Sequence, residues 1–354
     1  MKKRIFVLKV ICIVLCAFMA VTSASADDWI MDTIELTINT RFDEAEAVIH
    51  KRLAGGDSTL AVYFYHASIL NSKMTHFENN QDEQTFKKAI DKVIHGANKQ
   101  LASPSSIPDQ ELARVYFYRG SALGFLAYWQ GKEGAWFQAL DNGMASIADL
   151  EKAVKLDSTL YDAYLGIGVY KYWRSTKLKF MLWLPFIPDS RQEGIASIKK
   201  AIQKGRYGAG MGMHQLIYIL LDFGQFQEVL PYAEEVVSLY PESQFMWWAN
   251  AHTYFKSRDY RKAIRSYLRL LTLIEEDDRH NPNHWAACRV RLADIYYRVQ
   301  DFESALHHSN TALKKLQWTD MSEKTREHYQ QALLLAKKSE QALARLSIKN
   351  TQYQ

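Results

Sequence analysis

Proline and glycine are both scarce in this sequence, whose 354 residues include only 7 Pro and 16 Gly. These residue types mark most turns and interrupt helices, so a chain with few of them has few long loops and β-turns. The composition therefore favours helices. Aromatic residues are plentiful by contrast, at 13% of the chain, and can fill the spaces between packed helices.

Cysteine is rarer still, with three in the whole chain. Two of them, Cys12 and Cys16, lie in an N-terminal segment that we expect to be removed. Only Cys288 then remains, and a single cysteine cannot form an internal disulfide. Packing alone must hold the fold together, and we interpret Cys288 itself as a small core residue.

The N-terminal segment has the pattern of a secretory signal peptide. Residues 1–26 begin with basic side chains, continue with an apolar run from Val10 to Val21, and end in Ala24-Ser25-Ala26. This succession predicts cleavage between Ala26 and Asp27 and export to the periplasm or cell envelope, or secretion. An uncleaved anchor is the alternative, but the run is shorter than the ~18–20 residues that span a bilayer.

No excess of either charge survives removal of this leader. The leader holds four basic residues and no acidic one, which leaves 40 Lys and Arg against 39 Asp and Glu. The basic balance of the full chain is therefore an effect of the leader. A nearly neutral mature chain gives no reason to expect a nucleic-acid partner.

An internal repeat organises the rest of the chain. In residues 216–241, 247–270 and 292–313, a helical pattern meets a short polar turn, an aromatic residue follows, and a helix rich in Ala and Leu comes next. Repetition at this spacing is typical of helical solenoids. The aromatic residues that follow the turns are Phe226, Tyr260 and Phe302.

These stretches resemble tetratricopeptide repeats, most clearly in residues 210–243, 244–277 and 286–319. The second of these departs from the family pattern at Asn250, Arg258 and Leu270. Its matching residues are Trp247, Ala251, Tyr254, Tyr260, Ala263 and Tyr267. The resemblance implies an all-α, right-handed solenoid of about six helical hairpins. Residues 131–143 look like an interruption of one hairpin.

The resemblance also implies a division of the chain. A repeat domain would cover residues 27–319, and residues 320–354 would form a C-terminal capping helix and tail. Small residues such as Ala263 and Ala305 would let helices approach closely, while aromatic residues fill the holes between hairpins. No hairpin of this kind buries its own apolar face, so stacking is obligatory.

No group of residues indicates catalysis, and we expect a non-enzymatic protein without a cofactor or a metal. The glycines of residues 205–213 lack the preceding strand and the Gly-Lys-Ser/Thr ending of a phosphate loop. Acidic and histidine side chains gather in residues 275–284, but Asn281-Pro282 is ordinary turn chemistry there.

The tetratricopeptide resemblance places candidate binding residues on the first helix of each hairpin, which lines the concave face in this family. An aromatic groove with few charges suits a peptide or an apolar ligand. The same side chains could instead pack between neighbouring helices. The candidates are Tyr172, Trp173, His214, Tyr218, Trp248, His252, Arg291, Asp294 and Tyr297.

An apolar insertion at residues 175–189 lengthens one turn of the repeat domain. It contains Phe180, Trp183 and Phe186 and two prolines. Leaving these side chains in water would cost about 1.5–3 kcal/mol each. The segment could be a lid over the groove, which we favour, a docking site for another protein, or a contact with a membrane surface.

Together these features predict an exported, non-catalytic scaffold that binds a protein or peptide partner in its concave groove. The alternative is an envelope-associated protein that holds a lipid or other apolar ligand. A cavity beneath residues 178–188 would favour the ligand carrier, and an open groove would favour the scaffold.

Overall fold

The computed structural model describes residues 28–177, 188–279, 281–316 and 323–351. The predicted leader lies outside these residues, and so do Phe180, Trp183 and Phe186 of the insertion. Within the described ranges there are fifteen α-helices, one short 3-10 helix and no strand. The prediction of an all-α fold is confirmed.

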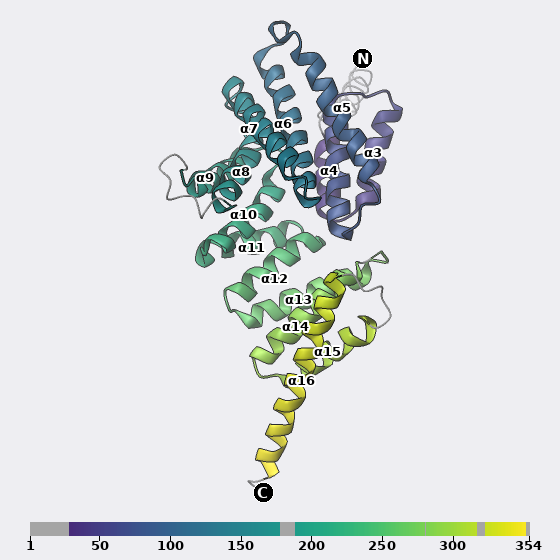
Figure 1. The fold of residues 1–354 in the computed structure, drawn as a ribbon, viewed down its shortest axis with the longest axis vertical. Helices are drawn as coiled ribbons and strands as arrows, with labels where there is room; N and C mark the ends of the chain where they lie inside the picture. Colours follow the sequence, from purple (N-terminus) through teal and green to yellow (C-terminus); the bar gives the residue numbers. More distant parts are fainter. Residues whose placement is uncertain (1–27, 178–187, 280, 317–322, 352–354) are drawn as a thin grey trace, which may run out of the picture.

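Consecutive helices pack in pairs along the described part of the chain and form seven hairpins followed by a long last helix (Figure 1). The first helices are α2 (Asp28–Ile38), α3 (Phe42–Ala54), α4 (Leu60–Phe77), α5 (Glu83–Leu101), the 3-10 helix η1 (Pro104–Ser106), α6 (Asp109–Lys132), α7 (Trp136–Leu156) and α8 (Ala163–Lys177). The others are α9 (Arg191–Lys204), α10 (Ala209–Phe223), α11 (Phe226–Leu239), α12 (Gln244–Lys256), α13 (Tyr260–Glu276), α14 (Pro282–Arg298), α15 (Phe302–Leu316) and α16 (Glu323–Thr351).

The turn inside five hairpins has one residue in the left-handed backbone region, two positions before an aromatic residue. Gly224 takes this conformation at φ 81°, before Phe226. Arg258 takes it at φ 61°, although this sequence departs there from the glycine of the family pattern. The left-handed turn therefore forms even where glycine is replaced by another residue. The five residues are Thr40, Gly134, Gly224, Arg258 and Gln300.

Residues 131–143 do not interrupt a hairpin, contrary to the sequence-based expectation. Helix α6 ends at Lys132, Gly134 makes the left-handed turn, and α7 begins at Trp136. The sequence does not indicate this regular turn, because the first residues of α7 are large, exposed side chains and not the small and apolar residues that usually begin the second helix of a hairpin. Trp136 is 70% exposed and Phe137 is 90% exposed.

Close helix contacts follow the small residues that the repeat pattern singles out. Ala251, Ala263 and Ala305 are fully buried. Asn250, a departure from the pattern, is buried as well, but its polar groups have partners. Its amide donates to Ala233 O at 2.6 Å, and its Oδ1 accepts from Ser266 Oγ at 2.6 Å. A buried amide costs little when both ends are hydrogen-bonded in this way.

Helices α8 and α9 touch backbone to backbone. A Cβ added at Gly168 would lie 2.6 Å from Gly194 O, which is closer than real Cβ atoms come. This approach needs glycine on both helices. It brings Tyr172 into full burial against α10. No helix in the described ranges combines the length and apolarity needed to cross a bilayer.

The N-terminal hairpins contact the C-terminal half of the solenoid, where each repeat would ordinarily touch only its neighbours. Ser243 Oγ, at the N-cap of α12, donates to Ile38 O at 2.5 Å. Asn281 Nδ2, just before α14, donates to His76 O at 3.3 Å. These residues are 205 positions apart in both cases. The end of α4 thereby lies against the start of α14. In Figure 1, α14 is the green helix below the purple and blue helices to which α4 belongs.

Candidate functional site

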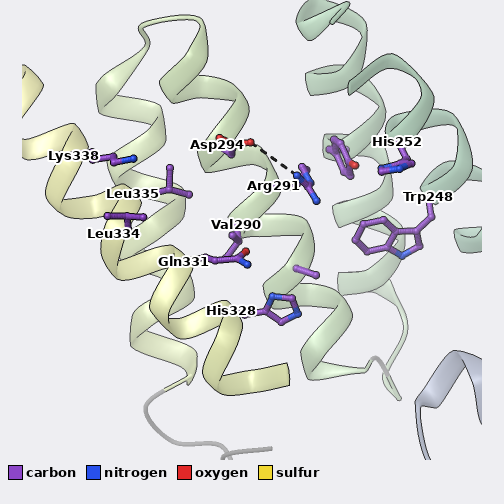
Figure 2. A pocket seen from close by; sticks show the side chains of 12 residues that line it. Trp248, His252, Val290, Arg291, Asp294, His328, Gln331, Leu334, Leu335 and Lys338 are labelled. Atoms are coloured by element: carbon purple, nitrogen blue, oxygen red, sulfur yellow. Dashed lines mark ion pairs between the residues drawn. The ribbon is translucent and has the colours of Figure 1, made fainter. Parts of the chain in front are cut away.

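One pocket of the described residues lies between α12, α13, α14 and α16 and has a volume of about 390 Å³. Figure 2 shows its two sides, with Trp248 and His252 facing His328, Gln331 and Lys338 across Arg291. The pocket forms because α16 lies against α14 and α15. A volume of this size suits a few side chains of a bound segment.

Four of the nine residues that the repeat register predicted for the groove line this pocket. They are Trp248 and His252 on α12 and Arg291 and Asp294 on α14. Two adjacent first helices supply them, as the register expects. Their role in binding stays a prediction.

The aromatic side of the pocket is held by packing against neighbouring rings. The Trp248 ring meets Tyr267 edge to face at a centroid distance of 5.9 Å. Its Nε1 is buried and has no hydrogen-bond partner among the described residues. An indole N–H is a donor only, and a buried donor without an acceptor is costly.

Arg291 is the cation at the centre of the pocket. Its guanidinium lies 4.4 Å from the centroid of the Phe255 ring and 4.0 Å from Asp294 Oδ2. The side chain is 39% exposed, so its remaining donors are available. Burial lowers the pKa of His252 to about 4, and the charge of Arg291 acts in the same direction. His252 is therefore neutral at physiological pH.

Helix α16, which the sequence predicts only as a capping helix, provides the opposite wall of the pocket. His328, Gln331 and Lys338 lie along one side of this helix and line the pocket. His328 Nδ1 is buried without a partner in the described residues. The repeat register cannot assign these residues because α16 lies outside the repeats. Their spacing along one side of the predicted capping helix is the signal that could have found them.

Two further candidates extend the aromatic side away from the pocket. Tyr218 stacks on His252 with ring centroids 6.1 Å apart. His214 meets Tyr218 at 5.1 Å and Phe245 at 6.2 Å. Burial lowers the pKa of His214 to about 4 and raises that of Tyr218 to about 12. These residues pack between neighbouring helices and do not line the pocket.

The other three candidates lie elsewhere. Tyr172 is fully buried in the core, and its hydroxyl donates to Asp222 Oδ2 at 2.5 Å. Trp173 packs against the same core. The close approach of α8 and α9 turns this part of α8 towards the interior. Tyr297 packs on Phe302 at a centroid distance of 5.4 Å, beside the α14–α15 turn.

The pocket combines cationic and N–H donors with aromatic surfaces. Arg291 and Lys338 contribute the cationic donors, and Trp248 and Tyr267 contribute the aromatic rings. Such a site can hold an extended segment that carries carbonyl or carboxylate groups and an apolar side chain. Over the described ranges, no three His, Cys, Asp or Glu side chains gather as metal ligands. Cys288 is buried in the core, as predicted, and burial raises the pKa of its thiol.

Neither a protein-family model nor a curated protein matches this chain. Among solved structures, a chain of the APC/C hetero-tetramer Cut9–Hcn1 is similar, with a TM-score of 0.53 and 14% identity over 92% of this chain. PilW, a widely conserved type IV pilus biogenesis factor, has a TM-score of 0.47 and 12% identity, covering 75% of this chain and 98% of its own. A tetratricopeptide repeat protein from Parabacteroides merdae has a TM-score of 0.37 and 13% identity over 82% of this chain and 98% of that one.

At these identities a structural likeness shows the fold and not the function. The match to the Cut9–Hcn1 chain covers 57% of that chain, so this protein spans little more than half its length. The structural match, together with the seven described hairpins and their shared turn geometry, shows a solenoid of tetratricopeptide-like helical hairpins.

Proposed function

We propose that this protein is an exported, non-catalytic scaffold that binds a segment of a partner protein in the pocket between α12, α14 and α16. The observation that carries the proposal is the Arg291 guanidinium at its centre, 39% exposed, between the Trp248 ring on one side and the polar residues of α16 on the other (Figure 2). Peptide carbonyl and carboxylate oxygens are the acceptors that its N–H donors fit.

The lining of the pocket favours a peptide over a lipid. Arg291, Asp294, Gln331 and Lys338 make its walls too polar for an acyl chain, which would leave their charges desolvated and unpaired. An apolar ligand would require a cavity beneath residues 178–188, and most of that segment lies outside the described residues. We therefore prefer the protein-binding function.

Export, and the absence of a cofactor, metal or nucleic-acid partner, belong to the same proposal. Export rests on the basic, apolar and small-residue succession of residues 1–26. N-terminal sequencing of the mature protein should begin at Asp27. A mature chain that begins at Met1 would contradict export by this route.

Site-directed photo-crosslinking in the native cell tests the binding site. A photoreactive phenylalanine at Gln331, which lines the pocket, should capture a partner that the same probe at exposed Glu235 on α11 does not. Adding Arg291→Ala should reduce capture from position 331 by about tenfold or more, since a charge-assisted contact is lost. Equal capture from both positions, or capture indifferent to Arg291→Ala, would refute the proposed site.

A further inference from the structure

Glu78 occupies a backbone position that usually belongs to glycine. It ends helix α4 in the left-handed region, with φ 51° and ψ 38°, and its N–H donates to Met74 O. Helices often end in this conformation with glycine, because a Cβ is strained there. A non-glycine residue held in it is a reason to look for a role of the side chain.

The Glu78 carboxylate joins three residues from the opposite half of the chain. Its Oε1 accepts from Lys324 Nζ at 2.6 Å, and its Oε2 accepts from Asn283 Nδ2 at 3.2 Å. His284 Nε2 lies 3.7 Å from Oε1. We call Glu78 with Asn283, His284 and Lys324 the clasp. The His284 ring and the Lys324 ammonium hold the pKa of Glu78 well below its usual range, so Glu78 keeps its negative charge.

Further contacts place the clasp within a continuous interface. Arg279 NH1 donates to Asp43 Oδ2 on α3 at 2.5 Å. The buried His76 ring meets Phe245 at 5.3 Å and His284 at 5.5 Å. Thr325 Oγ1 on α16 donates to Asn283 Oδ1 on α14 at 2.9 Å, which ties the two helices to each other at the same point.

The two helices that the clasp holds carry the centre of the pocket, on α14, and one of its walls, on α16. Asn283 and His284 lie in the first turn of α14, which carries Arg291 two turns later. Lys324 lies in the first turn of α16, one turn before His328. His284 also meets the Trp248 ring, at a centroid distance of 6.0 Å. The clasp therefore lies where α14, which carries Arg291, and the α16 wall both meet Glu78.

We propose that Glu78 is a positioning residue: from the N-terminal half, it fixes the first turns of α14 and α16 and so holds Arg291 and the α16 wall of the partner-binding pocket at their working separation. This inference rests on the proposed function for the meaning of the pocket, but its test needs no partner. Partner binding then depends on closure of the solenoid by its N-terminal hairpins.

Hydrogen–deuterium exchange of the full chain provides the test, with Glu78→Gly compared against Gln300→Gly. Both changes put glycine at a position where the backbone is left-handed, because Gln300, like Glu78, has a positive φ, of 64°. The Gln300 side chain is exposed and lies outside the clasp, so Gln300→Gly is the matched control. Glu78→Gly should accelerate exchange about tenfold in the second turns of α14 and α16, the first whose N–H groups are hydrogen-bonded within each helix, because local opening loses the charge-assisted contacts. Gln300→Gly should leave exchange in both second turns unchanged.

Glu78→Gln separates positioning from a purely structural effect. It removes the charge but keeps the backbone strain, the side-chain length and one acceptor oxygen. In the native protein, raising NaCl from about 0.05 M to about 0.5 M should accelerate exchange at the start of α16, since salt screens the ion pair. In Glu78→Gln this salt dependence should vanish. The proposal is overturned if Glu78→Gly behaves like Gln300→Gly, if faster exchange is confined to residues 76–82, or if the salt dependence persists in Glu78→Gln.

Discussion

Thr40 shows the strain that a single residue can carry in this fold. It makes the turn between α2 and α3 with φ 61°, although it is β-branched. A β-branched residue in the left-handed region is a true outlier, because its Cβ substituents crowd the backbone. Thr40→Gly should therefore raise the free energy of unfolding by about 0.5–1 kcal/mol, as measured by the urea midpoint. Thr40→Ala keeps the Cβ and should gain much less; an equal gain would mean that the strain is not in the backbone.

Buried alanines lie where two helices come too close together for a larger side chain. Ala263 on α13 and Ala305 on α15 are fully buried at close helix contacts. Ala263→Leu and Ala305→Leu should each lower the free energy of unfolding by about 1–3 kcal/mol through overpacking. Ala148→Leu on the exposed face of α7 is the matched control and should change it by less than about 0.5 kcal/mol. Unchanged denaturation midpoints for both buried variants would show that the repeat register is wrong.

At the scale of helix pairs, the contact between α8 and α9 depends on having no side chain at all. A Cβ at Gly168 would meet Gly194 O and the Ile198 backbone N, which cannot move aside as a side chain could. Gly168→Ala should destabilise the protein by about 1–3 kcal/mol in urea unfolding, despite the better helix propensity of alanine. Gly143 in α7 has its nearest neighbour atom 3.9 Å from the added Cβ, so Gly143→Ala should stabilise by about 0.5–1 kcal/mol. The same sign for both variants would contradict this account of the contact.

At the scale of the whole molecule, buried neutral histidines link stability to pH. Burial lowers the pKa of His76 to about 3 and that of His214, His252 and His308 to about 4, from an ordinary value of 6.5. Below pH 6.5 the unfolded chain binds protons that the folded chain does not, so stability is full above this pH and falls as the pH drops towards about 4.

Urea unfolding at several pH values between about 7 and 4.5 measures this loss, and each histidine steepens it by at most about 1.4 kcal/mol per pH unit. His214→Phe should make the curve shallower, because a phenyl ring preserves the packing on Tyr218 and Phe245 but takes up no proton. Carboxylates with lowered pKa values, such as Glu78, lose their contribution only at lower pH. A pH-independent stability across this range would contradict the assignment of neutral buried histidines.

The closed arrangement also changes how the molecule should behave as a repeat protein. In an open solenoid, stability is a sum over neighbouring repeats, and unfolding can begin at either end. Here α3 and α4 are bound to the starts of α14 and α16 through Asp43, His76 and Glu78. Loss of either end therefore removes contacts from both halves of the chain.

The sequence by itself determined the helical hairpins and four of the twelve residues that line the candidate pocket. The spacing of Ala251, Ala263 and Tyr267 is local information, because residues on one helix face recur at fixed intervals. The same register placed Trp248, His252, Arg291 and Asp294 on one surface. It also predicted the burial of Cys288, whose neighbours in sequence are small.

Only the tertiary structure decided which of these residues meet and what lies opposite them. Tyr172 is internal because two glycines let α8 and α9 approach, and the repeat register does not indicate which way a helix then turns. His328 and Lys338 become pocket residues because α16 lies against α14. The clasp joins positions more than 200 residues apart. Helix periodicity reports which face of an element is buried, whereas contacts between distant elements depend on the summed angles of every hairpin between them.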